Sequence, residues 1–521
     1  MLNRIKAFLQ KQSVNIIALR FIIHNFRVWK KFRPFADCKS EVLFEQNGIC
    51  SSIVATSYLA NVLAERHQSK LVAYSFSLAG TNNWLNELYA SFNFKTFLNV
   101  SLNADQIARA EMIFEKLYPT LKDLHQIERI SIDGVWIGDL VYDEYLRQYN
   151  VPTINITDPR FIDSLKISLG HYIFWKDYFD EHEVKAVGLS HCVYKLAIPL
   201  RLAVNRSIPV YQINATHIYH LNKNNLFAYT DFISYPKIFS SLPTEVRDAG
   251  ILDARNRIFR RFDGEVGVDM KYSTKSAYAG KKAHPVLRKS DRIKILIAPH
   301  SFSDSPHSYG LNLFPDFYVW MDFLGKMSEA TDYDWYIKTH PDCLSEDLRI
   351  IDQFVKKYPQ LTLLPSDTSH HQIIEEGISF ALTIYGTIGF EYAALGVPVI
   401  NGSSGNPHVA YGFNIHPKSL DEYQNLLRNL AAIRLDINVH EVFEYYFMSK
   451  IFTTENWLFK DYRRTNHLVG NHPMSPVWFS AWLGEWSRTR HRESIVALGA
   501  FVESGEFRLR RAEPKEAPII V

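Results

Sequence analysis

Lysine, histidine and proline stand together at residues 338–341, a combination that suits the binding of phosphate. Lys338 and His340 follow a short apolar run, and Pro341 restricts the direction of the histidine because it disfavours helical angles in the preceding residue. The lysine offers a point charge and the imidazole a hydrogen-bond donor, and a phosphate or diphosphate accepts both. The alternative for His340 is a histidine that is only hydrogen-bonded within the fold.

A second motif, SFALTIYGTIGFEYAALGVPVINGSS at 379–404, combines a strand, a turn and a helix. Its apolar opening predicts a buried strand, and Thr387 is a predicted N-cap for a helix over 388–395. Backbone N–H groups and the helix dipole converge on an anion at such a turn, and Gly389 lets a ligand approach the backbone. Glu391 lies one turn further, where it could accept hydrogen bonds from two ribose hydroxyls; alternatively it only complements the helix dipole.

Both motifs lie in a chain whose apolar runs alternate with helical periodicity, and this pattern predicts an α/β fold. In the first half, a strand at 42–45, a helix at 51–66 and a strand at 70–76 form a predicted βαβ unit, which requires a parallel sheet. A second series begins at Ile293. Because the carboxyl ends of parallel strands share one edge, the polar loops of this series are predicted to gather at one site. These loops are 299–312, which contains Ser301 and Ser303, 338–342 and 385–391.

Composition describes a soluble globular protein with more than one domain. The chain has 521 residues, 47% of them hydrophobic and 22% charged, and is too long for one ordinary core. A net charge of only +3 gives no indication of nucleic-acid binding. The four cysteines are scattered without a CxxC pair, which argues against a disulfide framework or a zinc cage and fits a reducing cytoplasm. No apolar run is long enough to span a bilayer and no signal-peptide cleavage site is present, so the protein is expected to stay where it is made.

The segment 1–36 differs from the rest of the chain in charge. It holds eight lysines and arginines and no acid, which leaves −5 for the remainder. Aliphatic and aromatic residues lie between these charges, so the segment is predicted to be a basic amphipathic helix on an anionic membrane surface. The alternative is a helix packed on the body of the protein, because the apolar positions do not form one clean stripe.

The remaining segments follow from changes in periodicity. Residues 37–238 and 291–433 are two predicted Rossmann-like domains, and 239–290, where charge, Gly, Ser and Pro accumulate, is predicted to be a linker and mobile loop. The extension at 434–521 is predicted to be irregularly helical, with a weakly ordered tail after Asn471.

The order of KTHPD, an apolar strand and TIYGTIGFEYAALGVPVI resembles the C-terminal half of GT-B glycosyltransferases of bacterial surface-polysaccharide biosynthesis. The nearest likeness is to capsule enzymes of the Kdo or sialic-acid type, and relatives that use UDP sugars share the His-Pro element. The resemblance covers 293–433 well and the N-terminal half more loosely. It implies two Rossmann-like domains that face a cleft, the first for the acceptor and the second for the nucleotide sugar. It implies that His340, Pro341, Thr387 and Gly389 lie at the donor phosphate and that Glu391 lies at the nucleotide ribose. Lys338, Ser301 and Ser303 complete the predicted donor-binding residues, and the two serines are assigned by location only.

In sugar-transferring clefts of this build, the base that takes the acceptor proton comes from the N-terminal half. The candidates are Asp139, Glu45 and His191. Asp139 ranks first because Gly134 and Gly138 leave bare backbone that a sugar could approach, although each candidate is alternatively structural. No cofactor and no obligatory metal is expected, because amide donors, a helix dipole and an imidazole can stabilise the leaving phosphate.

The sequence therefore predicts a metal-independent glycosyltransferase that moves a sugar from a CMP- or UDP-linked donor to a surface-polysaccharide or lipid-linked glycan. It is expected to be cytoplasmic and peripheral on the inner face of the cytoplasmic membrane. Its partners would be a nucleotide sugar, a glycan acceptor and anionic lipid, with no nucleic acid. Three alternatives stay open: a CDP-polyol phosphotransferase of the teichoic-acid type, a non-hydrolysing UDP-sugar epimerase, and a nucleotide-sugar-binding scaffold without turnover.

Overall fold

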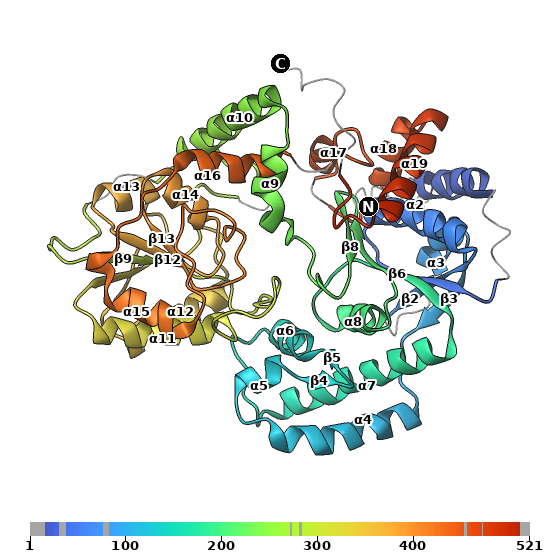
Figure 1. Ribbon diagram of the computed structural model, residues 1–521, viewed down its shortest axis with the longest axis horizontal. Helices are drawn as coiled ribbons and strands as arrows, with labels where there is room; N and C mark the ends of the chain where they lie inside the picture. The colour runs from blue at the N-terminus through green and yellow to red at the C-terminus, as the bar shows by residue number, and fades with distance from the viewer. Residues whose placement is uncertain are drawn as a thin grey trace, which may run out of the picture.

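The computed structural model describes residues 16–30, 38–76, 83–270, 274–280, 284–452, 456–470 and 472–510. Two largely parallel sheets, each with helices on both faces, form the two halves of the molecule (Figure 1). The prediction of an α/β chain with two Rossmann-like domains is confirmed.

The N-terminal sheet has the strand order β3-β2-β1-β6-β7-β8, and all neighbours are parallel except β7 and β8. Its strands are β1 (Glu41–Glu45), β2 (Lys70–Ser75), β3 (Phe94–Asn99), β6 (Val184–Leu189), β7 (Val210–Asn214) and β8 (His217–Leu221). The predicted first βαβ unit is confirmed, since β1 and β2 pair in parallel and flank α2 (Cys50–His67). The strand order reverses between β1 and β6, and open α/β sheets bind ligands at such a reversal, beyond the carboxyl ends of the strands.

Alternate side chains of each strand enter different cores, because successive residues of a strand point to opposite faces. Val42 and Phe44 of β1 pack under one helical layer, while Leu43 packs under the other. The first layer contains α2, α3 (Asn83–Ala90), α18 (Val477–Glu485), α19 (Arg488–Ser504) and a helix over 16–30, whose last two residues are in a 3-10 turn and which we call the N-terminal helix. The second layer contains α4 (Ala104–Leu117), α6 (Gly138–Tyr149), α7 (Pro159–Glu181) and α8 (Ile198–Asn205).

The C-terminal sheet has five parallel strands in the order β11-β10-β9-β12-β13, and its order reverses between β9 and β12. The strands are β9 (Lys294–Ile297), β10 (Asp334–Ile337), β11 (Leu361–Leu363), β12 (Phe380–Thr383) and β13 (Val399–Asn401). One face packs against α11 (Phe317–Ala330), α12 (Ser345–Lys357) and α15 (Leu420–Arg428). The other face packs against α13 (His370–Glu375) and α14 (Ile388–Ala394).

Two connections join the halves, and both differ from the sequence prediction. The segment 239–290 is not only a linker, because α10 (Thr244–Phe262) is a 19-residue helix that packs with α16 (Val439–Tyr446) over the second domain. After α16 the chain returns to the first domain, where α18 and α19 complete the core; the tail is therefore ordered as far as residue 510. Residues 511–521, part of the predicted weak tail, lie outside the described residues.

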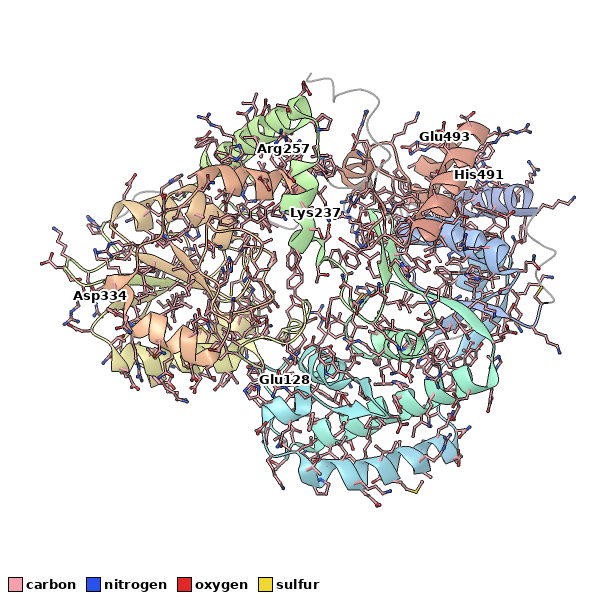
Figure 2. All side chains as sticks on the ribbon, viewed as in Figure 1. Glu128, Lys237, Arg257, Asp334, His491 and Glu493 are labelled. Carbon is pink, nitrogen blue, oxygen red and sulfur yellow. The ribbon has the colours of Figure 1, made fainter. Side chains whose placement is uncertain are left out.

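One face of the N-terminal helix packs on the body of the protein, as the alternative to a membrane-surface helix predicts for that face. Phe21 and Trp29 are 0% and 2% exposed, and the ring of Trp29 meets His491 of α19, which Figure 2 labels. Residues 1–15 and 31–37 of the predicted basic segment lie outside the described residues. Among the helices in the described ranges, none combines the length and the apolarity that a bilayer crossing requires.

Candidate functional site

The ligand-binding edges of the two sheets meet across the domain junction. The loop after β9 reaches the first domain, where the Ser305 hydroxyl donates to the Tyr194 hydroxyl at 2.7 Å. The Tyr385 hydroxyl, from the loop after β12, donates to the Ser305 carbonyl at 3.0 Å. Tyr194 has φ 61° and ψ −175°, backbone angles that only glycine adopts without strain, and such strain accumulates at functional sites. The loops at the strand ends of the two halves are therefore in contact.

A cavity of about 290 Å³ lies beyond the carboxyl ends of β9, β10 and β12. Six of the eight predicted donor residues line it together: Ser301, Lys338, His340, Pro341, Thr387 and Glu391. Ser303 is buried beside this lining, and Gly389 faces away from it. The His-Pro loop and the Thr387 turn, which are far apart in the sequence, thus share one cavity.

His340 is held in one protonation state by its own loop. Its Nδ1 accepts a hydrogen bond from the Asp342 backbone N–H at 3.0 Å, so the proton of the neutral ring resides on Nε2. Burial, against the opposing charges of Asp342 and Glu391, lowers the pKa of His340 and favours this neutral form. The ring therefore presents an Nε2–H donor, which is the role predicted from the sequence.

Lys338 places a positive charge at the cavity, and two hydrogen bonds fix the position of its ammonium group. Its Nζ donates to the Thr339 carbonyl at 3.0 Å and to the Ser366 carbonyl at 2.9 Å, and the residue is 3% exposed. Burial lowers the pKa of this lysine to about 8, so its ammonium form still predominates at neutral pH. One N–H of the ammonium group then remains for a ligand.

The turn that begins α14 offers fewer free backbone N–H groups to an anion than predicted. Thr387 occupies the N-cap position with helical angles, and within the described residues its side chain makes no cap hydrogen bond. The amides of Gly389, Phe390 and Glu391 donate to carbonyls of the turn, which leaves at most those of Thr387 and Ile388 for an anion. The predicted anion cradle therefore depends mainly on side chains.

Gly389 serves packing rather than ligand approach. A Cβ at this position would lie 2.5 Å from His408 Nδ1 and 3.0 Å from Asn414 Nδ2, both of which are buried behind α14. The glycine is required because these side chains occupy the space that its side chain would fill. The assignment of Gly389 to the donor phosphate is not supported by its position.

We expect Gly389→Ala to lower the free energy of unfolding by about 1–3 kcal/mol, the usual cost of an extra methyl group in a filled core. Gly499→Ala in α19 is the matched control, because no described atom lies within 4 Å of its added methyl group. The control should stabilise by about 0.5–1 kcal/mol, since alanine is the better helix former. Urea denaturation of both variants measures the difference, and equal stability of the two would contradict the packing role.

Glu391 is bound by two residues that the sequence analysis did not single out. Arg261 of α10 forms an ion pair with Glu391 Oε1, and the Tyr278 hydroxyl donates to Oε2 at 3.0 Å. A carboxylate has about four lone-pair sites, so both oxygens can still accept ribose hydroxyls. Both partners lie in the segment predicted to be linker and loop, and no spacing in the sequence relates them to Glu391. They orient the carboxylate toward the cavity.

A second cavity of about 490 Å³ adjoins the first. The two share His300, Ser301 and His340, while Asp304 and Asp342 line only the second. His300 Nε2 accepts from the Tyr385 N–H at 3.3 Å, and burial lowers the pKa of this ring to about 4, so it is neutral. A ligand seated in the first cavity can therefore extend into the second past two neutral imidazoles.

In the first domain, two of the three candidate bases are linked through a serine at the strand reversal. The Ser190 hydroxyl donates to Glu45 Oε2 at 2.7 Å and lies 2.7 Å from His191 Nδ1. Because the hydroxyl has only one proton, His191 must donate through Nδ1, which leaves the lone pair on its Nε2. Glu45 is 8% exposed, whereas His191 is exposed. The arrangement presents an imidazole base that is oriented by a buried carboxylate.

Asp139, the first-ranked candidate, is unsuited to act as a base. It is buried, and its Oδ2 accepts from Arg201 Nη2 at 2.5 Å. The nearby glycines have structural roles: Gly138 would bring a Cβ to 2.6 Å from the Glu128 carbonyl carbon, and Gly134 has φ 77° in the turn between β4 (Ser131–Ile132) and β5 (Val135–Trp136). An acceptor cannot reach this carboxylate.

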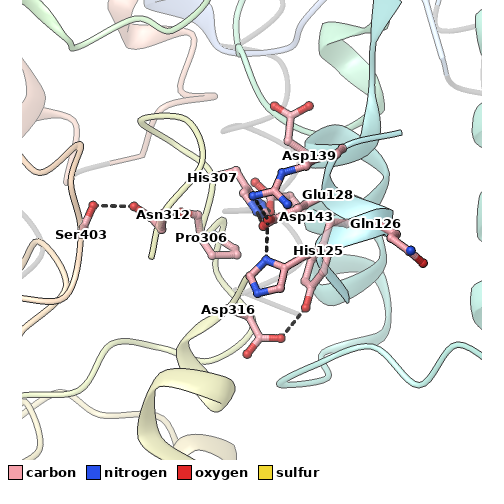
Figure 3. A network of polar contacts seen from close by, with 12 residues as sticks. His125, Gln126, Glu128, Asp139, Asp143, Pro306, His307, Asn312, Asp316 and Ser403 are labelled. Carbon is pink, nitrogen blue, oxygen red and sulfur yellow. Dashed lines mark hydrogen bonds and ion pairs between the residues drawn. The ribbon is translucent and has the colours of Figure 1, made fainter. Parts of the chain in front are cut away.

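Beside Asp139 and Arg201 lies a buried charge cluster at the domain junction (Figure 3). His307, from the loop after β9, lies between Asp143 of α6 and Glu128 of α5 (Leu124–Glu128), with Nδ1 2.6 Å from Asp143 Oδ1 and Nε2 3.1 Å from Glu128 Oε2. Burial opposes the charge on His307, but the two carboxylates outweigh it and raise the pKa of the ring to about 10. An imidazolium therefore ties the two halves together.

Comparison with known proteins leaves the family open. No family model matches the sequence, and no curated protein matches it. Solved structures with a similar fold include UDP-GlcNAc 2-epimerase from Neisseria meningitidis bound to UDP-GlcNAc (11% identity, 78% of this chain and 98% of that chain, TM-score 0.21). A glycosyltransferase from Rickettsia africae is also similar, with 10% identity over 80% of this chain and 94% of that chain and a TM-score of 0.23. So is MurG from Acinetobacter baumannii, with 10% identity over 89% of this chain and 100% of that chain and a TM-score of 0.20.

Proposed function

We propose that this protein is a GT-B glycosyltransferase that moves a sugar from a nucleotide-activated donor to a glycan acceptor. The observation that carries the proposal is the shared cavity, where Lys338, His340, Thr387 and Glu391 lie together beyond the strand ends of the second domain. Donors for phosphate and an acceptor for ribose hydroxyls are the two recognition elements that a nucleotide requires. A bare phosphate-binding site would not need the buried carboxylate.

In the proposed donor complex, the first cavity holds the nucleotide and the second holds the sugar. Glu391 accepts the ribose hydroxyls, while Lys338 and His340 donate to the phosphate. The shared imidazoles then flank the bond between phosphate and sugar. The proposal includes both CMP- and UDP-linked donors, because the residues named here contact the phosphate and the ribose and not the nucleobase.

The proposed transfer uses one residue from each domain at the reacting atoms. His191 Nε2 takes the proton of an acceptor hydroxyl, and the oxygen forms a bond to the anomeric carbon. The bond from that carbon to the phosphate oxygen breaks, and its electron pair goes to the nucleotide phosphate. His340 Nε2–H stabilises the developing charge on that oxygen. The positive charge on His191 is stabilised through Ser190 by Glu45.

Nucleotide release from defined donors tests the proposal. The full-length protein is incubated with CMP-, UDP- and CDP-linked donors, with and without a glycan acceptor, and products are identified by mass spectrometry. Acceptor-dependent release of one nucleotide with transfer of a sugar supports the proposal. Transfer of a polyol phosphate, a new epimer formed from UDP-sugar alone, or binding without release would each replace it with one of the alternatives.

The tautomer of His340 leads to a prediction for the donor site. His340→Ala should lower turnover by about 10²-fold, or roughly 3 kcal/mol, because one preorganised donor to the leaving group is lost. His467→Ala on α17 (Tyr462–Leu468) is the control, since this exposed histidine lies far from the donor cavity in the chain and outside its lining. Steady-state kinetics with the donor identified above give the comparison. Unchanged kinetics in a folded His340→Ala protein would refute the role.

The proposal places the reaction at the inner face of the cytoplasmic membrane, with a lipid-linked or growing surface glycan as acceptor. Metal-independence belongs to the same proposal, since the side chains described above suffice to neutralise a leaving phosphate. Turnover after treatment with EDTA tests this part. Loss of activity that Mg²⁺ restores would assign the leaving-group role to a metal instead.

A further inference from the structure

The N-terminal helix has two distinct faces, and one of them is fixed to the first domain. Phe21 stacks on Phe479 of α18 with ring centroids 4.2 Å apart and meets Phe92 edge-on at 5.7 Å. Asn25 Nδ2 donates to the Ser91 hydroxyl at 3.1 Å, and both residues are buried. The helix therefore cannot turn its other face inward.

The outward face is apolar and cationic. Its four large apolar residues follow one another at intervals of three and four, so they form a single stripe along the helix. They are Ile16, Leu19, Ile23 and Phe26, which are 51%, 54%, 43% and 37% exposed. The exposed cations Arg20, Arg27 and Lys30 border this stripe, and 16–30 contains no acid. We call these seven residues the outer stripe.

The outer stripe differs from ordinary surface hydrophobicity. Single exposed apolar side chains are common on soluble proteins, and contiguous ones mark interaction sites. In the described part of the chain, no other helix exposes more than two large apolar side chains. The stripe also explains why the sequence shows no single clean amphipathic pattern: one set of apolar positions packs inward and a second set points outward.

The charges decide between the occupants that could cover the outer stripe. A second copy of the chain would bring Arg20, Arg27 and Lys30 against the same cations, with no acid in the stripe to neutralise them. An anionic bilayer offers both complements, an apolar interior below and negative headgroups around it. Each cation near such a surface adds to the attraction, and salt screens it.

We infer that the outer stripe is a docking surface for an anionic lipid bilayer, on which the N-terminal helix lies parallel to the membrane plane. Its four apolar side chains enter the boundary between headgroups and acyl chains, and its cations contact the headgroups. Because the helix is fixed to the first domain, that domain becomes the membrane-facing half. His191 belongs to the same domain, so an acceptor carried on a lipid would arrive at the half that holds the proposed base.

Vesicle binding tests this inference without any donor or turnover, so its outcome is independent of the proposed function. The full-length protein is sedimented with vesicles of phosphatidylglycerol and phosphatidylcholine, and with vesicles of phosphatidylcholine alone. We expect binding to the anionic vesicles that weakens with added salt. The double variant Leu19→Asp/Ile23→Asp should bind at least about tenfold more weakly, since it places charge where apolar contact is required.

The control variant is Ile107→Asp/Met112→Asp on α4, whose side chains are each 55% exposed. It adds the same charge to the first domain and should leave binding unchanged. Arg20→Gln/Arg27→Gln should weaken binding to anionic vesicles and reduce its salt dependence, whereas Lys116→Gln on α4 should not. Circular dichroism confirms that each variant is folded, as expected for exposed positions.

Three results would overturn the inference. The Leu19→Asp/Ile23→Asp variant could retain full binding, or the α4 variant could lose as much. Light scattering could also show a dimer that Leu19→Asp/Ile23→Asp converts to a monomer while vesicle binding is absent, which would assign the outer stripe to a second copy of the chain. Deleting the helix is a poorer test, because its buried face belongs to the core of the first domain.

Discussion

We expect His191→Ala to reduce turnover by about 10²- to 10⁴-fold, the range over which a positioned general base contributes. The reason is geometric, because Ser190 accepts the Nδ1 proton and leaves Nε2 to receive the proton of the acceptor. The limb of the pH–rate profile that reports this base should disappear in the variant. Donor binding, measured by calorimetry, should change little, since the nucleotide contacts lie in the other domain.

Two further variants separate a base from a structural histidine. Glu45→Gln keeps an acceptor for the Ser190 hydroxyl but removes the negative charge behind it, so its turnover should lie between that of wild type and that of His191→Ala. His440→Ala, at an exposed position of α16, should match wild type. If His191→Ala keeps the full profile, or if it loses donor binding and turnover together, the base must be sought elsewhere.

His307→Gln should lower the free energy of unfolding by about 3–5 kcal/mol near neutral pH, because it removes the cation that lies between two buried carboxylates. Asp143 then loses its cationic partner, while Glu128 keeps only His125 and Arg129 on its other oxygen. The side chains of His307, Asp143 and Glu128 are 1%, 1% and 0% exposed, so water cannot replace the lost partner. Denaturation by urea, followed by tryptophan fluorescence, measures the loss. His125→Gln is the control, since His125 contacts Glu128 from the exposed side.

The same cluster predicts a pH dependence. The pKa of His307 is raised from 6.5 to about 10 in the folded protein, so its contribution is fully present below pH 6.5 and declines as the pH rises toward 10. The difference in stability between wild type and His307→Gln should therefore shrink between pH 6.5 and 10. A difference that stays constant across this range, or that grows, would show that the ring is held neutral.

Periodicity predicts the fold well where the residues within a segment determine whether it forms a strand or a helix. The strands and helices from 293 to 433 follow from apolar runs and turn residues, and the motif at 379–404 folds as the strand, turn, helix and strand expected. The shared edge of parallel strands also brought Lys338, His340 and Glu391 together correctly. These inferences depend on local geometry and on one rule of sheet topology.

The errors arose where tertiary contacts decide a residue's role. Gly389 and Gly138 are glycines because His408 and the Glu128 backbone occupy the adjoining space, and neither neighbour is visible in the sequence. The neighbouring glycines of Asp139 suggest a carboxylate that a sugar can approach, but Arg201, which pairs with Asp139 in the buried site, lies 62 residues away in the sequence. Arg261 and Tyr278 were missed for the same reason. The accumulation of charge, Gly, Ser and Pro at 239–290 likewise hides the helix α10, and the tail after Asn471 lacks a clear pattern that would reveal the packed helices α18 and α19.

The route of the chain has a consequence for biosynthesis. The first domain ends with the last described residues, since the Phe507 carbonyl accepts from the His220 N–H and the Leu509 N–H donates to the Ile218 carbonyl, which extends the sheet beyond β8. Phe479 and Trp482 close its core. During translation, the first domain therefore cannot complete its core and sheet until the second domain and the C-terminal helices have been synthesised. Chaperones that shield apolar nascent segments would meet this protein through its N-terminal half.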